Sequence, residues 1–100
     1  MTARIWEGRT KIEHSGIYTE IIEERDIPDY RKTDGFVKFT FLKRNDNQFT
    51  FFKLITFWED LEVIKNFTGP NLEKAVSYKA DEKYLIDFPG NVMHYEVFAE

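Results

Sequence analysis

Cysteine is absent from this chain of 100 residues, which excludes disulfides, thiolate nucleophiles and zinc sites built on cysteine. Histidine is nearly absent, because only His14 and His94 could offer an imidazole, and a histidine-rich metal site is therefore excluded. The 18 acidic residues outnumber the 14 basic ones, and the net charge of −4 disfavours a nucleic-acid binder that depends on phosphate contacts. We expect neither a metal nor a nucleic-acid partner.

Long hydrophobic runs are missing as well. No apolar stretch approaches the roughly 20 residues that span a bilayer. The first residues lack the basic segment and apolar core of a secretory signal. We therefore expect one domain over residues 1–100, located in the cytoplasm and without a membrane partner.

Aromatic residues, in contrast, are abundant: 10 Phe, 5 Tyr and 2 Trp make up 17% of the chain. A domain this small has little interior in which to bury so much apolar surface. The periodicity of the sequence predicts where that surface lies. The predicted strands are 2–9, 36–44, 49–58 and 92–98. The first predicted helix runs from about 12 to 28, where Pro28 ends the regular helix and residues 29–32 continue as a short turn. Two further helices are predicted from 60 to 69 and from 71 to 76, with residues 77–90 irregular.

The main elements follow one another as strand, helix, strand, strand, helix, strand. This order is typical of the α+β, ferredoxin-like βαββαβ fold, which has a four-stranded antiparallel sheet with its helices on one face. Within the second strand, Val37, Phe39 and Phe41 should share one face, and Lys38, Thr40 and Leu42 the other. The acidic residues of the first helix, from Glu20 to Asp26, are predicted to form a solvated face.

The strand at 49–58 is apolar on both faces. Phe49, Phe51, Ile55 and Phe57 alternate with Phe52, Leu54 and Trp58, and such a strand is usually buried on both sides. Two helices can cover one face only, so we expect a homodimer in which two sheets pack face to face. The alternative is a monomer whose exposed apolar patch binds another partner.

Four segments of the sequence resemble the antibiotic biosynthesis monooxygenase (ABM) family. They are residues 3–6 (ARIW), 28–33 (PDYRKT), 54–59 (LITFWE) and 94–97 (HYEV). The resemblance extends from Ala3 to Phe98 and implies a dimeric α+β barrel. The family includes enzymes that oxidise aromatic polyketide-type substrates with O₂ and without metal, flavin or nicotinamide. It also includes quinol oxidases and heme-degrading monooxygenases.

The heme-degrading branch matches this sequence poorly. Those enzymes carry an Asn near the end of the first strand, a Trp at the end of the third and a His on a later helix. Trp58 matches the Trp, but Gly8 and Ser77 stand where the Asn and the His would be. The resemblance therefore implies no cofactor, and we expect that heme is not degraded.

Three candidate catalytic residues follow from this comparison. Trp58 could stack on a flat ligand at a cleft mouth, or it could be a core tryptophan with a satisfied indole N–H. His94 could act as a general base, or it could be a structural histidine. His14 and Tyr18 lie four residues apart on the first helix and could contact the same ligand, or His14 could lie on the helix surface.

Other residues are predicted to bind substrate. Tyr30 and Arg31 follow Pro28, and Arg31 could hold a carboxylate or phenolate, or pair with a neighbouring aspartate instead. Phe39, Phe41, Phe52 and Leu54 should wall an apolar pocket. We expect Trp58, His14 and Tyr18 to converge on one cleft per subunit.

Two functions remain open from the sequence. The first is a cofactor-independent monooxygenase or oxidase that acts on a small aromatic or quinol-type substrate, which itself supplies the electrons. The second is a non-catalytic, small-molecule-binding or stress-associated homodimer of the same fold.

Overall fold

The computed structural model describes residues 1–76, 78–87 and 92–100. Within these residues no helix is long and apolar enough to cross a membrane. The strands are β1 (Thr2–Lys11), β2 (Phe36–Asn45), β3 (Phe49–Trp58) and β4 (Met93–Glu96). The helices are α1 (Ser15–Ile21), α2 (Ile27–Arg31), α3 (Lys65–Thr68) and α4 (Lys79–Tyr84), with short turns η1 (Ile12–His14), η2 (Ile22–Asp26) and η3 (Glu62–Ile64).

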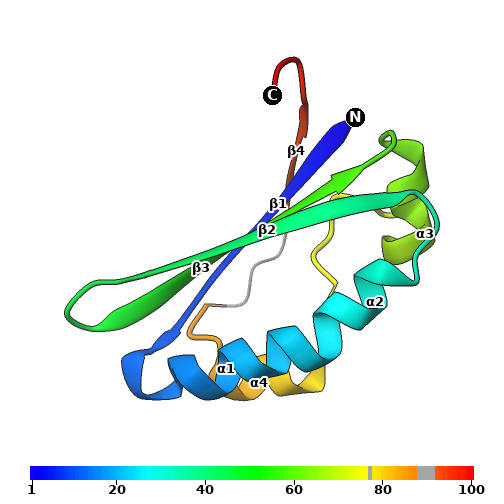
Figure 1. The fold of residues 1–100 in the computed structure, drawn as a ribbon. Helices are drawn as coiled ribbons and strands as arrows, with labels where there is room; N and C mark the ends of the chain where they lie inside the picture. The colour runs from blue at the N-terminus through cyan, green and yellow to red at the C-terminus, as the bar shows by residue number, and fades with distance from the viewer. Residues whose placement is uncertain (77, 88–91) are drawn as a thin grey trace.

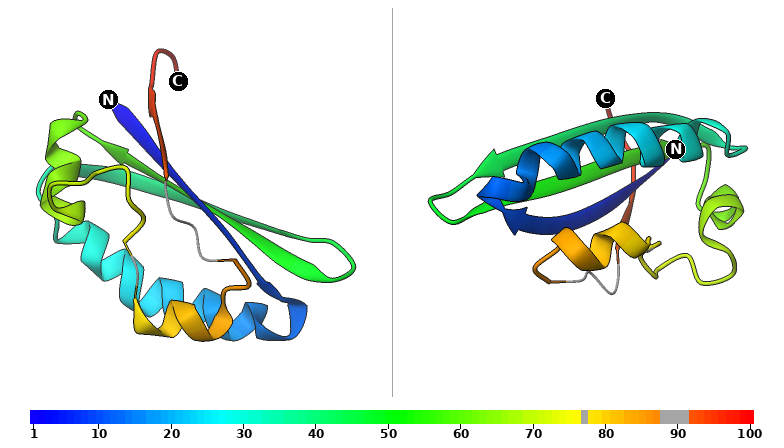
Figure 2. Two further views of the ribbon diagram at one scale, coloured as in Figure 1. Left: turned by 180° about the vertical axis from the view of Figure 1, so that it is seen from behind. Right: turned by 90° about the horizontal axis from the view of Figure 1, so that it is seen from below.

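The four strands form one antiparallel sheet in the order β2-β3-β1-β4. The helices gather on one side of this sheet, as Figures 1 and 2 show. This is the ferredoxin-like arrangement, so the predicted fold class is confirmed. β1 pairs with β3 along its whole length, whereas β4 pairs only with Thr2–Ile5 at the start of β1.

The first helical region is one continuous rod from η1 to α2 (Figure 1). The prediction that Pro28 ends the helix is wrong, because η2 is a π-helical turn in which the N–H of Ile27 donates to the carbonyl of Ile22, five residues back. This wider turn restarts the helix at Ile27, so Pro28 falls in the first turn of α2, where its missing N–H costs little.

The second helical region departs further from the prediction. Asp60 caps the turn as expected, because the N–H of Val63 donates to its carboxylate over 2.9 Å. The predicted helix at 71–76 does not form. Arg4 donates hydrogen bonds to the carbonyls of Leu72 (2.5 Å) and Lys74 (3.1 Å), which removes these acceptors from a helical ladder.

α4 lies within the segment that was predicted to be irregular. Seen from below, it runs beside β1 (Figure 2), and the N–H of Ile86 donates to the carbonyl of Arg9. Its first turn is capped by Asp81, whose carboxylate accepts the N–H of Tyr78 at 3.1 Å. Contacts with residues distant in sequence fix this helix, which explains why local periodicity gave no signal for it.

β2 contains a register shift that changes which of its side chains face the helices. The register slips between Phe36 and Lys38, so Val37 is the extra residue and is 47% exposed. Phe36, Phe39 and Phe41 therefore share the face toward the helices, and the prediction that Val37 joins Phe39 and Phe41 is wrong. Before the strand, Gly35 has φ of +92°, a conformation that favours glycine.

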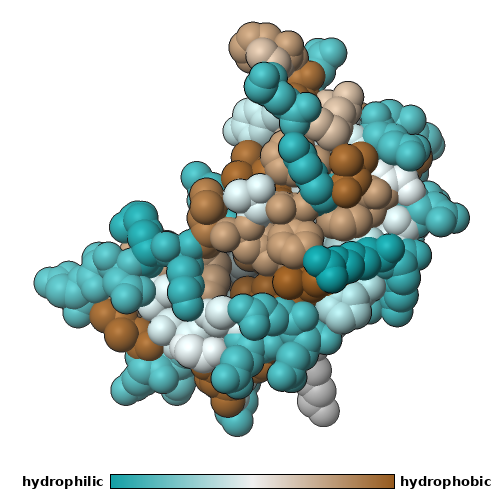
Figure 3. All heavy atoms as spheres, viewed as in Figure 1, coloured by the Kyte–Doolittle hydropathy of each residue, from teal (hydrophilic) through white to brown (hydrophobic). Residues whose placement is uncertain are grey.

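The two faces of β3 differ in the way its alternation predicted. Phe52, Leu54 and Trp58 face the helices and are buried. Phe51, Ile55 and their neighbours Phe49 and Phe57 are only partly buried, and they belong to what we call the open face, the side of the sheet that carries no helix. Apolar side chains are visible along β2 and β3 in Figure 3.

Candidate functional site

A small cavity with polar walls lies between the helical rod and the sheet. Its volume is about 20 Å³, enough for about one water molecule. We call it the polar cavity. Its polar lining residues are Arg4, Tyr18, Arg25, Asp26, Tyr30, Tyr78 and Asp81, and its apolar ones are Trp6, Leu54, Phe67 and Val76.

Asp81 is the centre of the polar cavity. Its carboxylate accepts the hydroxyl of Tyr18 at 2.8 Å and Nη2 of Arg25 at 3.1 Å, besides the backbone N–H of Tyr78. Only 3% of Asp81 is exposed. A single carboxylate from α4 thus holds α1, η2 and its own helix together, and a buried carboxylate needs such partners to remain charged.

Arg25 supplies the opposite charge. Its Nε donates to Asp26 at 2.5 Å, and its guanidinium lies 4.0 Å from the centre of the Tyr78 ring. Burial lowers the pKa of Arg25, but the hydrogen bonds and the attraction from Asp26 and Asp81 outweigh burial and raise its pKa overall. Nη1 of Arg25 is buried and has no hydrogen-bond partner within the described residues. One donor is therefore available to an oxygen atom at this site.

Asp26 is the second buried carboxylate and is 6% exposed. Burial raises its pKa, although the hydrogen bond and positive charge of Arg25 oppose that rise. A carboxylate with a raised pKa is a better proton acceptor than an ordinary aspartate.

Three phenols complete the polar cavity, and all remain protonated at neutral pH. Burial, the charge of Asp81 and the hydrogen bond to it raise the pKa of Tyr18. Burial and the nearby charge of Asp26 raise the pKa of Tyr30. Burial raises the pKa of Tyr78, whose hydroxyl donates to Asp29 at 2.8 Å. The hydroxyls of Tyr18 and Tyr78 are already bound to carboxylates, whereas no such bond is formed by Tyr30 among the described contacts, so Tyr30 is the phenol that can donate to an anion formed there.

Arg4 and His94 form the edge of this site on β1 and β4. Arg4 is 3% exposed, and burial lowers its pKa to about 10, with a small opposing effect from Tyr30. Nη1 of Arg4 donates to Nε2 of His94 at 2.9 Å. A guanidinium can only donate, so Nε2 accepts and His94 is neutral with its proton on Nδ1. Burial and then the charge of Arg4 lower the pKa of His94.

Some of the predicted site residues meet in this structure. Tyr18, Tyr30 and Leu54 line the polar cavity. Phe52 packs beside Tyr18, with ring centres 5.3 Å apart. Phe39 lies next to Phe41, which packs on the core at Tyr30.

Other predicted residues lie elsewhere. Trp58 is fully buried and its indole N–H donates to the hydroxyl of Thr56 at 2.9 Å, which is the geometry of a core tryptophan. His14 packs against Tyr84 with ring centres 5.4 Å apart, and Arg31 is exposed with its guanidinium 5.5 Å from the ring of Phe39.

The expected cleft shared by Trp58, His14 and Tyr18 does not form. Trp58 packs with Tyr30 and Ile64, whereas Tyr18 belongs to a separate part of the core. His94 could act as a base only after it leaves Arg4, because Arg4 occupies its accepting nitrogen. Ser77 lies outside the described residues.

Five polar residues of the site were missed in the sequence: Arg4, Arg25, Asp26, Tyr78 and Asp81. The prediction that the acidic run is solvated is wrong for Asp26, although a signal for its burial was present. Tyr18, Ile22, Asp26 and Tyr30 recur every four residues, and all four are at most 7% exposed. No group of His, Asp and Glu in the described part of the chain is placed to hold a metal ion.

Two solved structures resemble this chain closely in shape. A putative antibiotic biosynthesis monooxygenase from Bacillus cereus matches with a TM-score of 0.58 and 20% identity, over 99% of this chain and 94% of that one. SnoaB, a cofactor-independent oxygenase from Streptomyces nogalater whose solved structure is a variant, matches with a TM-score of 0.59 and 12% identity, over 99% and 95%. The chain has the fold of the antibiotic biosynthesis monooxygenases.

The finding that shows the ABM fold is the likeness to these two solved structures. No protein-family model matches the sequence, and none of the curated proteins does. At 12% and 20% identity, the two neighbours establish the fold but leave the chemistry to the residues of this chain.

The bond between Arg4 and His94 predicts a stability that depends on pH. Because the folded pKa of His94 is below its ordinary 6.5, the unfolded chain binds more protons in the window just below pH 6.5. The free energy of unfolding should therefore fall as the pH drops through that window. Above the window, the full contribution of the neutral His94 ring is retained. Urea unfolding at pH 7.5 and 5.5 measures this, and the His94→Gln variant should lose part of the pH dependence.

The control is His14→Gln, because Arg4 makes no hydrogen bond to His14 among the described contacts. A His94→Gln protein that keeps the full pH dependence of the native chain would contradict the assignment of the neutral ring.

Proposed function

We propose that this chain is an ABM-family enzyme, a cofactor-independent monooxygenase or oxidase that acts on a small aromatic or quinol-type substrate in the polar cavity. The observation that carries the proposal is the cavity itself. A carboxylate with a raised pKa, two guanidiniums and protonated phenols surround one small space. The fold shared with SnoaB, which is an oxygenase without a cofactor, supports this choice.

The chemistry needs a base and a site that stabilises an anion. With an anthrone, the methylene carbon loses two hydrogens and gains one oxygen atom of O₂ as a carbonyl, while the second oxygen atom leaves with both hydrogens as water. The substrate supplies the electrons, so no cofactor takes part. Asp26 would accept the first proton, and Nη1 of Arg25 and the hydroxyl of Tyr30 would donate to the resulting anion.

The size of the cavity sets a condition on this mechanism. About 20 Å³ does not hold an aromatic ring. The substrate enters only when the cover formed by Val76, Tyr78 and α4 moves away from η2, which breaks the bonds from Tyr78 to Asp29 and from Arg25 to Asp81. Closure over the substrate would then exclude water from the reacting atoms.

The small volume also favours a second candidate function. A closed ion network with room for about one water fits the non-catalytic, small-molecule-binding or stress-associated homodimer of this fold only if any small molecule binds outside the polar cavity. The experiment below separates the two.

Oxygen consumption with a panel of anthrones and quinols tests the catalytic proposal. Asp26→Asn keeps the shape of the side chain but removes the base, and the rate should fall by about a hundredfold or more. Tyr30→Phe should lower the rate less, because it removes one donor to the anion. The matched control is Asp34→Asn, an exposed aspartate outside the cavity.

Native protein that consumes no more oxygen than buffer with every substrate would refute catalysis and favour the binding function. Equal rates for the native chain and Asp26→Asn would leave catalysis standing but remove Asp26 as the base.

We further propose that the chain forms a homodimer through the part of the open face near the start of β1, which we call the apolar half. Ile5 and Ile55 lie opposite each other at the centre of this half, flanked by Phe57. Met93 is 60% exposed and Tyr95 is 52% exposed, and both lie on the same side of β4. A second copy would cover these side chains.

Ile55→Asp tests this interface. The variant should be monomeric or unfolded, because an unpaired carboxylate would be buried between the sheets. Light scattering at micromolar concentration should give about twice the 12.0 kDa of one chain for the native protein. Ile17→Asp, at an exposed isoleucine of α1, is the control and should stay dimeric. A native mass of one chain, or a stable dimer of Ile55→Asp, would contradict the proposal.

A further inference from the structure

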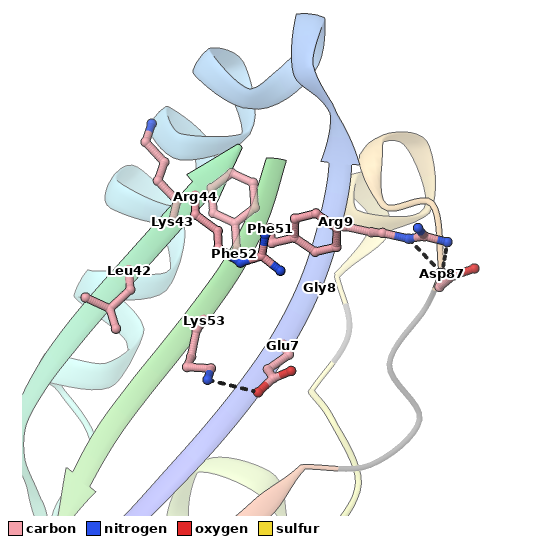
Figure 4. Close-up of a pocket in the computed structure, with 10 residues that line it drawn as sticks. All are labelled: Glu7, Gly8, Arg9, Leu42, Lys43, Arg44, Phe51, Phe52, Lys53 and Asp87. Carbon is pink, nitrogen blue, oxygen red and sulfur yellow. Dashed lines mark hydrogen bonds and ion pairs between the residues drawn. The ribbon is translucent and has the colours of Figure 1, made fainter. Parts of the chain in front are cut away.

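The polar cavity lies on the side of the sheet that the proposed dimer leaves uncovered. A hollow of about 560 Å³ lies on the other side, on the open face near the β2–β3 hairpin (Figure 4). The proposed dimer places a second copy on that face, so this hollow is not a free surface. The helices face away from such an interface, and the polar cavity between them and the sheet stays available to a ligand.

Two hydrogen-bond donors of the polar cavity lack an acceptor. Nη1 of Arg25 is buried and has no partner within the described residues. Tyr30 is only 7% exposed, and its hydroxyl makes no hydrogen bond among the described contacts. Both side chains line the same small space. Buried donors are nearly always paired in proteins, so two unpaired donors around one cavity indicate a site for an atom that only accepts.

Arg4 adds a positive charge that no carboxylate neutralises directly. Its guanidinium donates to the carbonyls of Leu72 and Lys74 and to Nε2 of His94, all of which are uncharged acceptors. Within residues 1–76, 78–87 and 92–100, Arg4 forms no ion pair. A buried cation without a counterion is costly, and an anion in the same cavity would lower that cost.

The two carboxylates of the polar cavity oppose an anion to different extents. Asp81 is engaged at both oxygens, because one accepts from Tyr18 and Arg25 and the other accepts the N–H of Tyr78. Asp26 is the remaining obstacle. When Asp26 is ionised, the charges of the two guanidiniums and the two carboxylates cancel. When Asp26 is protonated, one positive charge is left for an anion to neutralise.

The surroundings of Asp26 favour its protonation. Burial raises the pKa of Asp26, Arg25 of the same turn opposes that rise, and the charges of Asp81 on α4 and Asp29 on α2 add to it. The other titratable groups of the polar cavity are Arg4 on β1 and the three phenols, and all of them stay protonated at neutral pH. Asp26 is therefore the group that takes up a proton when an anion enters.

From these observations we infer that the polar cavity binds one chloride ion, or a halide of similar size, together with a proton on Asp26. Nη1 of Arg25 and the hydroxyl of Tyr30 donate to the ion, and Arg4 supplies the countercharge. The volume of about 20 Å³ exceeds the roughly 10–15 Å³ that one water molecule needs, so a single ion slightly larger than water fits. The cover need not be displaced to make room for the ion, as it must be for an aromatic substrate.

The inference concerns the site of the proposed function but does not rest on its oxygen chemistry. In the proposed reaction, an anion beside a protonated Asp26 is the arrangement that follows proton transfer, and chloride reproduces those charges. Because no substrate takes part, chloride binds whether or not the chain consumes oxygen.

Chloride-35 NMR tests the inference, because the line of free chloride broadens when the ion exchanges with a protein site. The line width is followed against chloride concentration at pH 7.5, with sodium methanesulfonate keeping the ionic strength constant. Asp26→Asn carries the neutral side chain that binding requires and should bind chloride at least about tenfold more tightly than the native chain. Adding Tyr30→Phe to Asp26→Asn should weaken binding by about tenfold, because the ion loses one donor.

Two controls make the result specific. Asp34→Asn removes the same charge from an exposed site outside the cavity and should bind chloride like the native chain. Crystals of Asp26→Asn soaked in sodium bromide should show an anomalous peak between Arg25 and Tyr30. This second measurement locates the ion and does not depend on whether the Tyr30→Phe variant folds.

The inference is overturned if Asp26→Asn binds chloride no more tightly than the native chain, or if Tyr30→Phe leaves the affinity of Asp26→Asn unchanged. Equal tightening in Asp34→Asn would show an effect of net charge and also overturn it. A bromide peak outside the polar cavity would mean an adventitious ion only, and the inference would fail in the same way.

Discussion

The partly buried charge of Arg25 sets how the helices and carboxylates are arranged around the polar cavity. Taking a guanidinium out of water costs several kcal/mol unless carboxylates and hydrogen bonds replace the solvent. Here Asp26 from the same turn and Asp81 from α4 replace it. Because Asp81 also accepts from Tyr18 and caps α4, the position of one guanidinium fixes how the second half of the chain covers the sheet.

Such a network is a poor way to gain stability. Well-packed apolar residues in place of a buried ion pair are often neutral or stabilising by about 1–4 kcal/mol. A chain with 17% aromatic residues has ample apolar material for this space. Charged and phenolic groups around a cavity are therefore the arrangement that we associate with function rather than with folding.

The sequence predicted the sheet better than the site. The alternation in β3 correctly assigned Phe52, Leu54 and Trp58 to the helix side. Successive side chains of a strand point to opposite faces of the sheet, so this assignment needs no knowledge of distant contacts. α4 and the extended stretch before it could not be predicted, since Asp81 and Arg4 fix them through contacts with residues far away in the sequence. Asp26 lies four residues after the buried Ile22, and this spacing indicates the buried side of the helix. An aspartate in an acidic run is usually solvated, however, so the burial of Asp26 was not predicted.

The central claim is that the charges of the polar cavity serve chemistry and not stability. The most direct measurement compares the native chain with the triple variant Arg25→Met, Asp26→Leu, Asp81→Asn, in which Asn keeps one side-chain oxygen to accept the hydroxyl of Tyr18. We expect a free energy of unfolding that is unchanged or higher, together with loss of substrate-dependent oxygen consumption. A variant that is several kcal/mol less stable but consumes oxygen at the native rate would contradict the claim.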